Sequence, residues 1–393
     1  MSFNVLQLVG SFQQGGSERQ ALQLARLLAE DGRCRVSLAT LDAEGVLRAD
    51  AERLGLGEIP EYRLTSFYNR NALTQVRRFA AYLREHDINV VHAHDFYTNI
   101  FGMAAAALAR VPARIASKRE TTGMRTTAQS FVQRRAYALA HAVVVNSEAV
   151  RRSLVSEGVR DEKIVTIYNG LDAARVTPPH GLTREAALAS FGLPTDAGLK
   201  FVTIVANLRH AVKDHPTFLR AARVVKERVA DARFVVAGEG ELTEAMRALA
   251  SELGLAQEVF FTGRCERPAE LLYASDVCVL SSRAEGFSNS ILEYMAAARP
   301  VVVTDVGGAR EAVREGETGY IVAPGDAEAL GARVASLLED AEGARRMGER
   351  GRQVIGEKFT CEAQLGRTLG LYERLLAGRR VADSRAELTR RKA

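Results

Sequence analysis

The sequence predicts an α/β protein of two doubly wound domains, each with a parallel sheet between layers of helices. Three observations lead to this fold class. Short β-branched runs alternate with helical patterns, the alternation stops once near the middle of the chain, and it then starts again. A length of 393 residues suits two cores, and 47% hydrophobic with 26% charged residues is the composition of an ordinary folded protein.

The first half of the chain is expected to form one domain, residues 1–175. Its apolar runs lack a period of two, which is typical of strands that are buried on both faces of a parallel sheet. Helical patterns such as residues 17–30 lie between the runs and supply right-handed crossovers. The predicted strands are NVLQLV, RVSLAT, INVVHAH, ARIAS and AVVVNS.

A linker is predicted over residues 176–199, because Asn-Gly, Pro-Pro and Gly-Leu-Pro steps break the rhythm from Tyr168 to Pro194. A second domain is then expected over residues 200–358. Its predicted strands are FVTIVAN, ARFVVAG, EVFFTG, DVCVLSS, RPVVVTD and GYIVA. An amphipathic helix over 359–376 follows, and we expect a basic, mobile tail over 377–393.

Composition and charge exclude several classes of protein. The four cysteines are scattered without zinc-ligand spacing and indicate reduced thiols. The N-terminus lacks a cationic signal region, and the apolar stretch 101–109 is too short to span a membrane, which predicts a cytoplasmic protein. Residues 1–180 carry 23 basic against 18 acidic side chains, whereas the remainder is balanced. Without a nucleic-acid motif, this asymmetry favours an anionic membrane or small molecule as the partner.

The segment EGFSNSILE is the strongest candidate for chemistry. Glu285 and Gly286 fall on a predicted strand-to-helix loop, Ser288 or Asn289 can cap the helix, and Glu293 lies about one turn inside it. Both carboxylates can then face one cleft, where they would hold sugar hydroxyls while helix amides meet an anion. The alternative is a capping box followed by an ordinary surface glutamate.

A second candidate is the loop after strand FVTIVAN. Asn207 ends this strand, and Arg209 and Lys213 follow it before a helix. Ligands of open parallel sheets bind at the carboxyl ends of the strands, where two cations suit a diphosphate. Two solvated loop cations are the alternative.

Two weaker signals lie in the first half. Gly15 and Gly16 open a helix where backbone could approach a phosphate or sugar, although a glycine turn with Ser17 as helix cap is an equal alternative. His92 and His94 are two residues apart, hence on one strand face, and His94 with Asp95 could line a cleft. A structural role for these histidines is the alternative.

Taken together, these motifs resemble those of the retaining GT-B glycosyltransferases of family 4. The resemblance runs from residue 3 to about residue 375, in the order that the family shows. It is carried by E-x₇-E, R-x₃-K, GGSERQALQLARLL, HAHD, NSEAVRRSLVSEGV with KIVTIYNGLD, AGEGEL, and TDVGGAREAVREGETGYIVAPGD.

The resemblance implies a fold and an activity. Two Rossmann-like domains would face a central cleft, the N-terminal domain binding the acceptor and the C-terminal domain the nucleotide-sugar. A sugar would be transferred with retention from a UDP-, GDP- or ADP-sugar to a hydroxyl of a lipid-linked or saccharide acceptor, in polysaccharide, lipopolysaccharide or glycolipid synthesis. No Asp-x-Asp motif is present, so we expect no metal requirement. We expect the protein to be in the cytoplasm, where it could also bind peripherally to the inner face of the membrane.

The resemblance also implies roles for individual residues. Arg209 and Lys213 would neutralise the donor diphosphate, Glu285 would meet the donor sugar, and Glu293 the ribose. Further contacts to the nucleotide-sugar would come from Gly15, Gly16, Asn207, Glu239, Gly286, Phe287, Ser288, Asn289 and Ser290.

One departure from the family pattern concerns the acceptor side. Many members have a threonine-x-histidine pattern where this chain has Lys118, Arg119 and Glu120. Arg119 or Lys118 could replace the histidine as an electrostatic clamp on acceptor or donor, and Glu120 could orient the acceptor hydroxyl. Two other functions stay open: a sugar-nucleotide epimerase of similar architecture, and a non-catalytic protein that binds a nucleotide-sugar.

Overall fold

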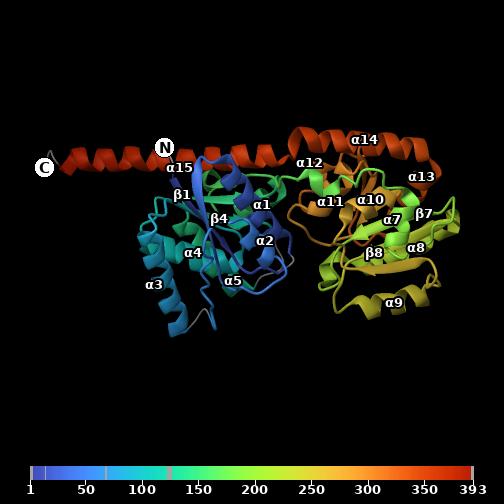
Figure 1. Ribbon diagram of the computed structural model, residues 1–393, viewed down its shortest axis with the longest axis horizontal. Coiled ribbons are helices and arrows are strands. Elements are labelled where there is room, and N and C mark those ends of the chain that lie inside the picture. The colour runs from blue at the N-terminus through green and yellow to red at the C-terminus, as the bar shows by residue number, and fades with distance from the viewer. Residues whose placement is uncertain (1–2, 14, 67–68, 122–125, 391–393) are drawn as a thin grey trace. The chain divides into compact units, whose positions relative to one another are not determined.

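The computed structural model describes residues 3–13, 15–66, 69–121 and 126–390, with side chains described as far as residue 378 (Figure 1). The chain forms two compact units. The N-terminal unit comprises Met1–Gly170 and Cys361–Ala393, and the C-terminal unit comprises Leu171–Thr360.

The N-terminal unit contains a six-stranded parallel sheet with the strand order β2-β1-β3-β4-β5-β6. Its strands are β1 (Phe3–Val9), β2 (Cys34–Thr40), β3 (Val90–Ala93), β4 (Ala113–Lys118), β5 (Ala142–Val145) and β6 (Ile164–Thr166). Its helices are α1 (Gly16–Asp31), α2 (Arg48–Arg53), α3 (Arg70–Glu85), α4 (Phe96–Leu108), α5 (Thr127–Leu139), α6 (Glu148–Ser156) and α15 (Cys361–Arg390).

Alternate residues of each strand belong to two separate cores on opposite faces of this sheet. On one face, Leu6 and Leu8 of β1 pack with side chains of α3, α4 and α5. On the other face, Val5 and Val9 pack with α1 and with Tyr372 of α15. Figure 1 shows α15 along one side of this sheet and α3 and α4 on the other. Burial on both faces explains why the strand sequences are apolar without alternation.

The C-terminal unit contains a second six-stranded parallel sheet, with the order β12-β11-β10-β7-β8-β9. Its strands are β7 (Lys200–Val205), β8 (Ala232–Ala237), β9 (Val259–Gly263), β10 (Val277–Leu280), β11 (Val301–Thr304) and β12 (Gly319–Val322). Its helices are α7 (Arg184–Ser190), α8 (His215–Arg228), α9 (Thr243–Glu252), α10 (Pro268–Ala274), α11 (Asn289–Ala296), α12 (Ala309–Ala312), α13 (Ala327–Glu339) and α14 (Ala341–Lys358).

Two cores again cover the two faces of the sheet. Val202 and Ile204 of β7 pack with α8, α9 and α13, whereas Phe201 packs with α7 and α10. The two doubly wound domains predicted from the sequence are therefore confirmed, and every strand run predicted in either half forms a strand.

Three segments differ from their prediction. Residues 164–166 form strand β6, a run too short to stand out in the sequence. The predicted linker 176–199 contains α7, whose Ala187 and Leu188 are buried in the core of the C-terminal unit. The final helix does not end at residue 376 but continues to Arg390, since no proline interrupts the segment after it. Mobility of the tail stays a prediction.

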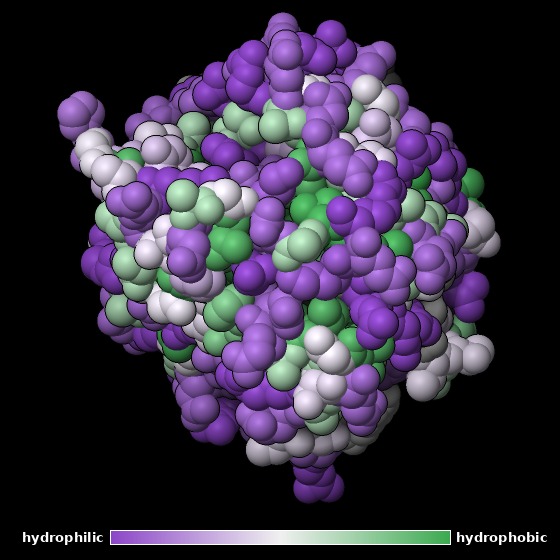
Figure 2. Space-filling view, turned by 90° about the vertical axis from the view of Figure 1, so that its right-hand side faces the viewer, coloured by the Kyte–Doolittle hydropathy of each residue, from purple (hydrophilic) through white to green (hydrophobic). Residues whose placement is uncertain are grey.

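Exposed apolar side chains are unevenly distributed. Among the described residues, the large hydrophobic side chains that are most exposed all belong to the N-terminal unit: Val46, Leu73, Tyr97, Leu108, Phe131, Leu139 and Val155. The face of the C-terminal unit in Figure 2 is mostly hydrophilic, with apolar residues in small separate patches. None of the described helices has the length and apolar character that a bilayer crossing requires.

Candidate functional site

The candidate site of the C-terminal unit lies at the carboxyl ends of β7 and β10. These strands are neighbours in the sheet, yet the chain leaves β7 toward β8 on one side and β10 toward β11 on the other. The strand order therefore reverses between them, and ligands of doubly wound sheets bind in the crevice that forms at such a reversal. The loops 206–214 and 281–288 follow these two strands and meet at this edge.

An ion pair joins the two loops. Lys213 Nζ lies 2.6 Å from Glu285 Oε1, and the Ser282 hydroxyl donates to the same carboxylate oxygen at 2.7 Å. The two charged side chains are 23% and 13% exposed, so both are shielded from most of the solvent while one edge stays accessible. The structure thus brings two sequence-predicted site residues into direct contact.

The loop that carries Lys213 is fixed by contacts that the sequence analysis did not foresee. Asp214 has φ of 49°, in the left-handed region, and accepts from Arg283 Nε at 2.9 Å and from the Thr217 hydroxyl at 2.8 Å. The Ser281 hydroxyl donates to the carbonyl of Lys213 at 2.9 Å. These bonds tie the β7 loop to the β10 loop and preorganise the cation beside Glu285.

Close backbone contacts shape the same edge. A Cβ added to Gly238 would lie 1.9 Å from the carbonyl oxygen of Ala206, and one added to Gly307 would lie 2.3 Å from that of Glu285. Gly307 also has φ of 53°, which favours glycine. Any larger residue at these two positions would push the surrounding loops apart.

Arg209 and Glu239 form a second, weaker pair. Their side chains are 41% and 50% exposed, and Arg209 Nη2 lies 3.4 Å from Glu239 Oε1. The Asn207 side chain accepts from the backbone N–H of Arg209 at 3.2 Å and so shapes the turn. The Arg209 guanidinium is consequently held less firmly than Lys213 and is free to reorient toward a ligand.

Helix α11 places Glu293 one turn from its start, as the sequence predicts. Glu293 Oε1 lies 2.7 Å from Arg175 Nε, and the Ser290 hydroxyl donates to the carbonyl of Val205 at 2.9 Å. Of the two caps that the sequence offers, Ser288 occupies the N-cap position but makes no capping hydrogen bond through its side chain, and Asn289 is the first residue of the helix, so a cap by Ser288 is wrong. The helix is instead held by its contact with β7.

Gly286, Phe287 and Asn289 lie on the loop and first turn before Glu293. The ring of Phe287 is 6% exposed and packs on Phe359 with the ring centroids 5.2 Å apart. Only its backbone is therefore available to a ligand. The carbonyl of Gly286 accepts from the N–H of Gly308 at 2.8 Å, which joins this loop to the turn after β11.

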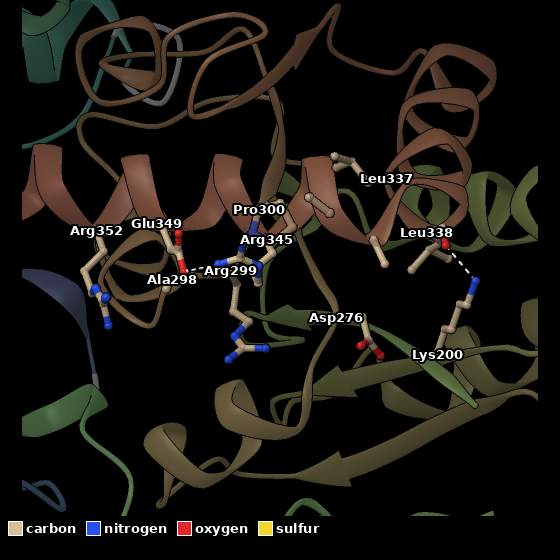
Figure 3. A pocket seen from close by; sticks show the side chains of 12 residues that line it. Lys200, Asp276, Ala298, Arg299, Pro300, Leu337, Leu338, Arg345, Glu349 and Arg352 are labelled. Atoms are coloured by element: carbon tan, nitrogen blue, oxygen red, sulfur yellow. Dashed lines mark hydrogen bonds and ion pairs between the residues drawn. The ribbon is translucent and has the colours of Figure 1, made fainter. Parts of the chain in front are cut away.

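A cavity of about 300 Å³ lies at the opposite edge of this sheet (Figure 3). It is lined in part by Lys200, Asp276 and Pro300, which stand at or just before the first residues of β7, β10 and β11. Lys200 Nζ donates to the carbonyl of Leu338 at 2.6 Å, and Arg299 Nη1 donates to that of Ser275 at 2.8 Å. These cations are engaged in holding the fold, and none of the predicted site residues lines this cavity.

A second polar constellation lies in the N-terminal unit, where the strand order reverses between β1 and β3. A Cβ on Gly10 would lie 2.6 Å from Asp95 Oδ2, and one on Gly15 would lie 2.0 Å from Glu18 Oε2. Glycine at both positions therefore leaves room for two carboxylates. Helix α1 begins at Gly16 with Gly15 as its N-cap, so the alternative of Ser17 as the cap is wrong.

Arg119 extends from the end of β4 into this constellation. Its Nη1 donates to Asn169 Oδ1 at 3.0 Å and its Nη2 to His94 Nδ1 at 3.3 Å. Its buried Nε has no hydrogen-bond partner among the described residues. Burial lowers the pKa of Arg119 to about 10, and burial raises the pKa of Glu18, with Asp95 adding to that rise. Arg119 Nε is thus a buried donor that is available to an oxygen atom of a ligand.

The neighbouring candidates have other roles. Lys118 is 5% exposed and lies 2.6 Å from Glu157 Oε1, so it stabilises the contact with α6. The prediction that His92 and His94 share one face is confirmed, since their rings stack with centroids 4.4 Å apart. Both are buried, and burial lowers the pKa of His92 to about 3 and that of His94 well below its ordinary value. His94 is therefore neutral within a polar network instead of lining an open cleft.

Among the described residues, no group of three or more histidine, cysteine or acidic side chains could hold a metal ion. The residues that sequence reasoning missed in the N-terminal unit are Gln7, Asn169 and Tyr372. Gln7 was detectable, because a glutamine inside an apolar strand run needs a buried partner. Nothing in the sequence pairs it with a tyrosine 365 residues away.

Comparisons with known proteins agree with this architecture. Residues 14–175 match the "Glycosyltransferase Family 4" family, and residues 188–354 match "Glycosyl transferases group 1". "Putative glycosyltransferase EpsF" of Bacillus subtilis (strain 168) is 30% identical over 310 residues, which cover 77% of this chain and 79% of that protein.

Two further comparisons cover different shares of the chain. N-acetyl-alpha-D-glucosaminyl L-malate synthase of Bacillus anthracis is 32% identical over 218 residues, or 54% of this chain and 55% of that protein. The chain thus matches about half the length of this relative. HepE of Anabaena in complex with UDP has a TM-score of 0.82 at 19% identity, covering 95% of this chain and 100% of HepE. The chain has the GT-B fold and belongs to glycosyltransferase family 4.

Proposed function

We propose that the protein is a retaining glycosyltransferase that transfers a sugar from a nucleotide-sugar to a hydroxyl of a lipid-linked or saccharide acceptor. The observation that carries this proposal is the pair of Lys213 and Glu285 at the strand-order reversal of the C-terminal unit. A cation there stabilises the departing nucleoside diphosphate, and a carboxylate accepts hydrogen bonds from donor-sugar hydroxyls.

The remaining residues of the C-terminal unit complete the donor site. Arg209 adds a second cation for the diphosphate, and Glu293 accepts from the ribose hydroxyls once it exchanges its bond to Arg175. Asn207, Glu239 and the backbone from Gly286 to Ser290 line the rest of the site. Leaving-group stabilisation by fixed side chains and amides needs no divalent metal.

In the N-terminal unit, we propose that Arg119 binds a substrate oxygen and that Gly15 and Gly16 let the substrate approach the backbone. His94 holds Arg119 and does not itself exchange protons. Glu18 accepts a hydrogen bond from a substrate hydroxyl.

Donor identity is testable by thermal shift with UDP-, GDP- and ADP-sugars. A ligand at about 100 times its Kd stabilises the fold by about 2.7 kcal/mol. UDP-sugars come first, because a solved structure of the same fold holds UDP. The absence of a shift with every nucleotide-sugar would contradict the proposal.

Product analysis separates the alternatives. A glycosyltransferase releases nucleoside diphosphate only with an acceptor, whereas an epimerase converts the donor alone, and a binding protein does neither. Proton NMR of the first-formed product should show a retained anomer, with activity unchanged by EDTA. An inverted anomer, or activity lost to EDTA and restored by magnesium, contradicts the mechanism.

We further propose that the N-terminal unit docks on anionic membrane. Leu73 of α3 and Phe131 of α5 are about half exposed, with exposed arginines at 77, 78, 134 and 135 nearby in the sequence. Phe79, Ala80 and Leu83 of α3 are buried in the core and do not belong to the proposed docking surface. At about 1 kcal/mol per basic residue, binding would be weak and salt-sensitive.

Liposome co-sedimentation tests the docking. Reversing the four arginines to glutamate should abolish binding to anionic vesicles at low salt, whereas reversing Arg228 and Arg345 of the C-terminal unit should leave it intact. Equal recovery on neutral and anionic vesicles would favour a soluble acceptor.

A further inference from the structure

A chain of buried hydrogen bonds connects Arg119 to the C-terminal helix α15, and all its members belong to the N-terminal unit. From Arg119 the contacts pass to His94 at 3.3 Å and from His94 Nε2 to Gln7 Oε1 at 2.6 Å. Gln7 Nε2 then donates to the Tyr372 hydroxyl at 3.0 Å. The chain continues from this hydroxyl to His92 Nδ1 at 2.7 Å, and from His92 Nε2 to the Ser117 hydroxyl at 2.9 Å.

The direction of the first bond in this series is fixed, because a guanidinium can only donate. His94 Nδ1 must therefore accept from Arg119, and because the ring is buried and neutral, its proton sits on Nε2. The Nε2–H donates to Gln7, which must present its carbonyl oxygen to His94 and its amide nitrogen to Tyr372.

The same logic fixes the second half of the chain. Gln7 Nε2 can only donate to the Tyr372 oxygen, so the buried Tyr372 proton is directed to His92 Nδ1, the other hydrogen-bond partner of this hydroxyl among the described residues. His92 then carries its own proton on Nε2 and donates to the Ser117 hydroxyl. Gln7, His92 and Ser117 are each at most 1% exposed, so no water competes for these bonds.

Arg119 is held at two of its three nitrogens. Nη1 is bound to Asn169 and Nη2 to His94, while the buried Nε has no partner among the described residues. The two bonds orient the plane of the guanidinium, and the remaining N–H groups are left for a ligand. If the proton of His94 were on Nδ1, that nitrogen could no longer accept from Arg119 Nη2. The guanidinium would then lose this hydrogen bond.

We infer that Gln7 and Tyr372 are positioning residues, which hold the Arg119 guanidinium in place for a substrate oxygen by locking the proton of His94 on Nε2. The inference rests on the proposed role of Arg119 in sugar transfer. It gives Tyr372 of α15 a part in the reaction, which it plays through Arg119. It also accounts for a glutamine in the middle of the first apolar strand.

The state of the histidines is tested without any assay of activity. In the full chain labelled with ¹⁵N-histidine, both rings should be neutral Nε2–H tautomers between pH 5 and 8. Replacing Gln7 by methionine should remove the fixed tautomer of His94. A wild-type ring that is protonated, or that carries its proton on Nδ1, overturns the inference.

The positioning role is tested by a double-mutant cycle. Tyr372→Phe and, independently, Gln7→Met should lower kcat/KM by about 10- to 100-fold, the range for displacement of a group that orients substrate. In an Arg119→Ala background, neither change should lower it further, since both act through Arg119. Tyr62→Phe is the matched control, because Tyr62 is a buried tyrosine of the same unit outside this series of hydrogen bonds. Its kcat/KM should stay at the wild-type value.

The outcomes separate the two proposals. If Arg119→Ala leaves activity unchanged, its role in the proposed function is wrong. If Arg119→Ala lowers activity while Tyr372→Phe and Gln7→Met do not, only the positioning inference is wrong. Equal losses of kcat/KM in the wild-type and Arg119→Ala backgrounds mean that the series of hydrogen bonds merely stabilises the fold. That result also overturns the positioning inference. If one variant does not fold, the other still decides the question, and the tautomers of the wild type decide it if both fail.

Discussion

Lys213 Nζ lies 2.6 Å from Glu285 Oε1, so the cation that we assign to the donor diphosphate is neutralised by the carboxylate that we assign to the donor sugar. A bound diphosphate must compete with this carboxylate for Lys213. The free protein therefore holds its own internal competitor at the proposed donor site.

Glu285→Gln removes the competing charge while it keeps a group that can accept from Ser282. We expect the affinity for the nucleoside diphosphate to rise about threefold to tenfold, because an ion pair of this exposure contributes about 1 kcal/mol. Turnover should fall, since donor-sugar hydroxyls lose their acceptor. Titration calorimetry and steady-state kinetics measure the two effects. A weaker affinity in this variant would mean that Glu285 itself supports the diphosphate.

Lys213→Ala should weaken binding of the same nucleotide by about tenfold or more, because a lost charge-assisted contact costs about 1.5–3 kcal/mol. Arg209→Ala should have a smaller effect, since that side chain is 41% exposed. Arg228→Ala is the control, because Arg228 pairs with Glu339 away from the proposed residues. Unchanged affinity in both the Lys213 and Arg209 variants would remove the cations from the donor site.

Glu293→Gln should raise the donor KM with little change in kcat, because a contact to the ribose lowers the free energy of the bound ground state and of the transition state by the same amount. Arg175→Ala leaves the carboxylate free for the ribose and should lower the donor KM. Steady-state kinetics with varied donor concentration distinguishes the two variants. A fall in kcat of the same size for Glu293→Gln and Glu285→Gln would show that the division of roles is wrong.

His215 provides a prediction about stability at acid pH. It is 2% exposed, and burial lowers its pKa from the ordinary 6.5 to about 4 in the folded state. As the pH falls below 6.5, His215 therefore becomes protonated in the unfolded state but stays neutral in the folded state. The free energy of unfolding decreases until about pH 4. From pH 7 to 5 this histidine alone should reduce the free energy of unfolding by about 2 kcal/mol.

The variant His215→Gln lacks this titration, so its own loss of stability between pH 7 and 5 should be about 2 kcal/mol smaller than that of the wild type. Urea unfolding at the two pH values, with hydrogen exchange of α8 to identify the transition, measures the difference. An identical pH dependence in both proteins would show that His215 is not the titrating group.

Ala298 is a residue whose replacement should stabilise the protein. It follows α11 with φ of 55°, a region that costs a residue with a Cβ about 1–2 kcal/mol. Ala298→Gly relieves this strain but adds about 0.4–1 kcal/mol of unfolded-state entropy, so a net gain of about 0.5 kcal/mol is expected. Ala297→Gly, at φ of −74°, is the matched control and should destabilise. A lower Tm for Ala298→Gly in thermal unfolding contradicts the strain argument.

The sequence was sufficient for features that depend on local pattern. Apolar runs such as FVTIVAN became strands because burial on both faces of a parallel sheet demands them, and Lys213 and Glu285 lie in the segments between a strand and the next helix, where the sequence predicted them. The contact between Lys213 and Glu285 was not predictable, since the two residues are 72 positions apart in the sequence. It depends on β7 and β10 being neighbours in the sheet.

The same reason explains the missed features of the N-terminal unit. The role of Gln7 depends on Tyr372, and that of Lys118 on Glu157, and neither partner is near in sequence. A cap by Ser288, one of the two that the sequence offered, is not formed, and the Ser290 hydroxyl instead ties the first turn of α11 to Val205 of β7. Propensity predicts the elements, but tertiary contacts decide which side chains are left for chemistry.

The return of α15 to the N-terminal unit also has a consequence for biosynthesis. Leu369, Leu371 and Tyr372 complete the core that begins with Val5 of β1, so the ribosome must translate residues 171–360 before this core can close. The C-terminal unit is continuous in sequence and can fold while still tethered to the ribosome. Until α15 is translated, α1 covers this face of the first sheet only in part, and nascent chains at that stage should be the substrates on which chaperones act.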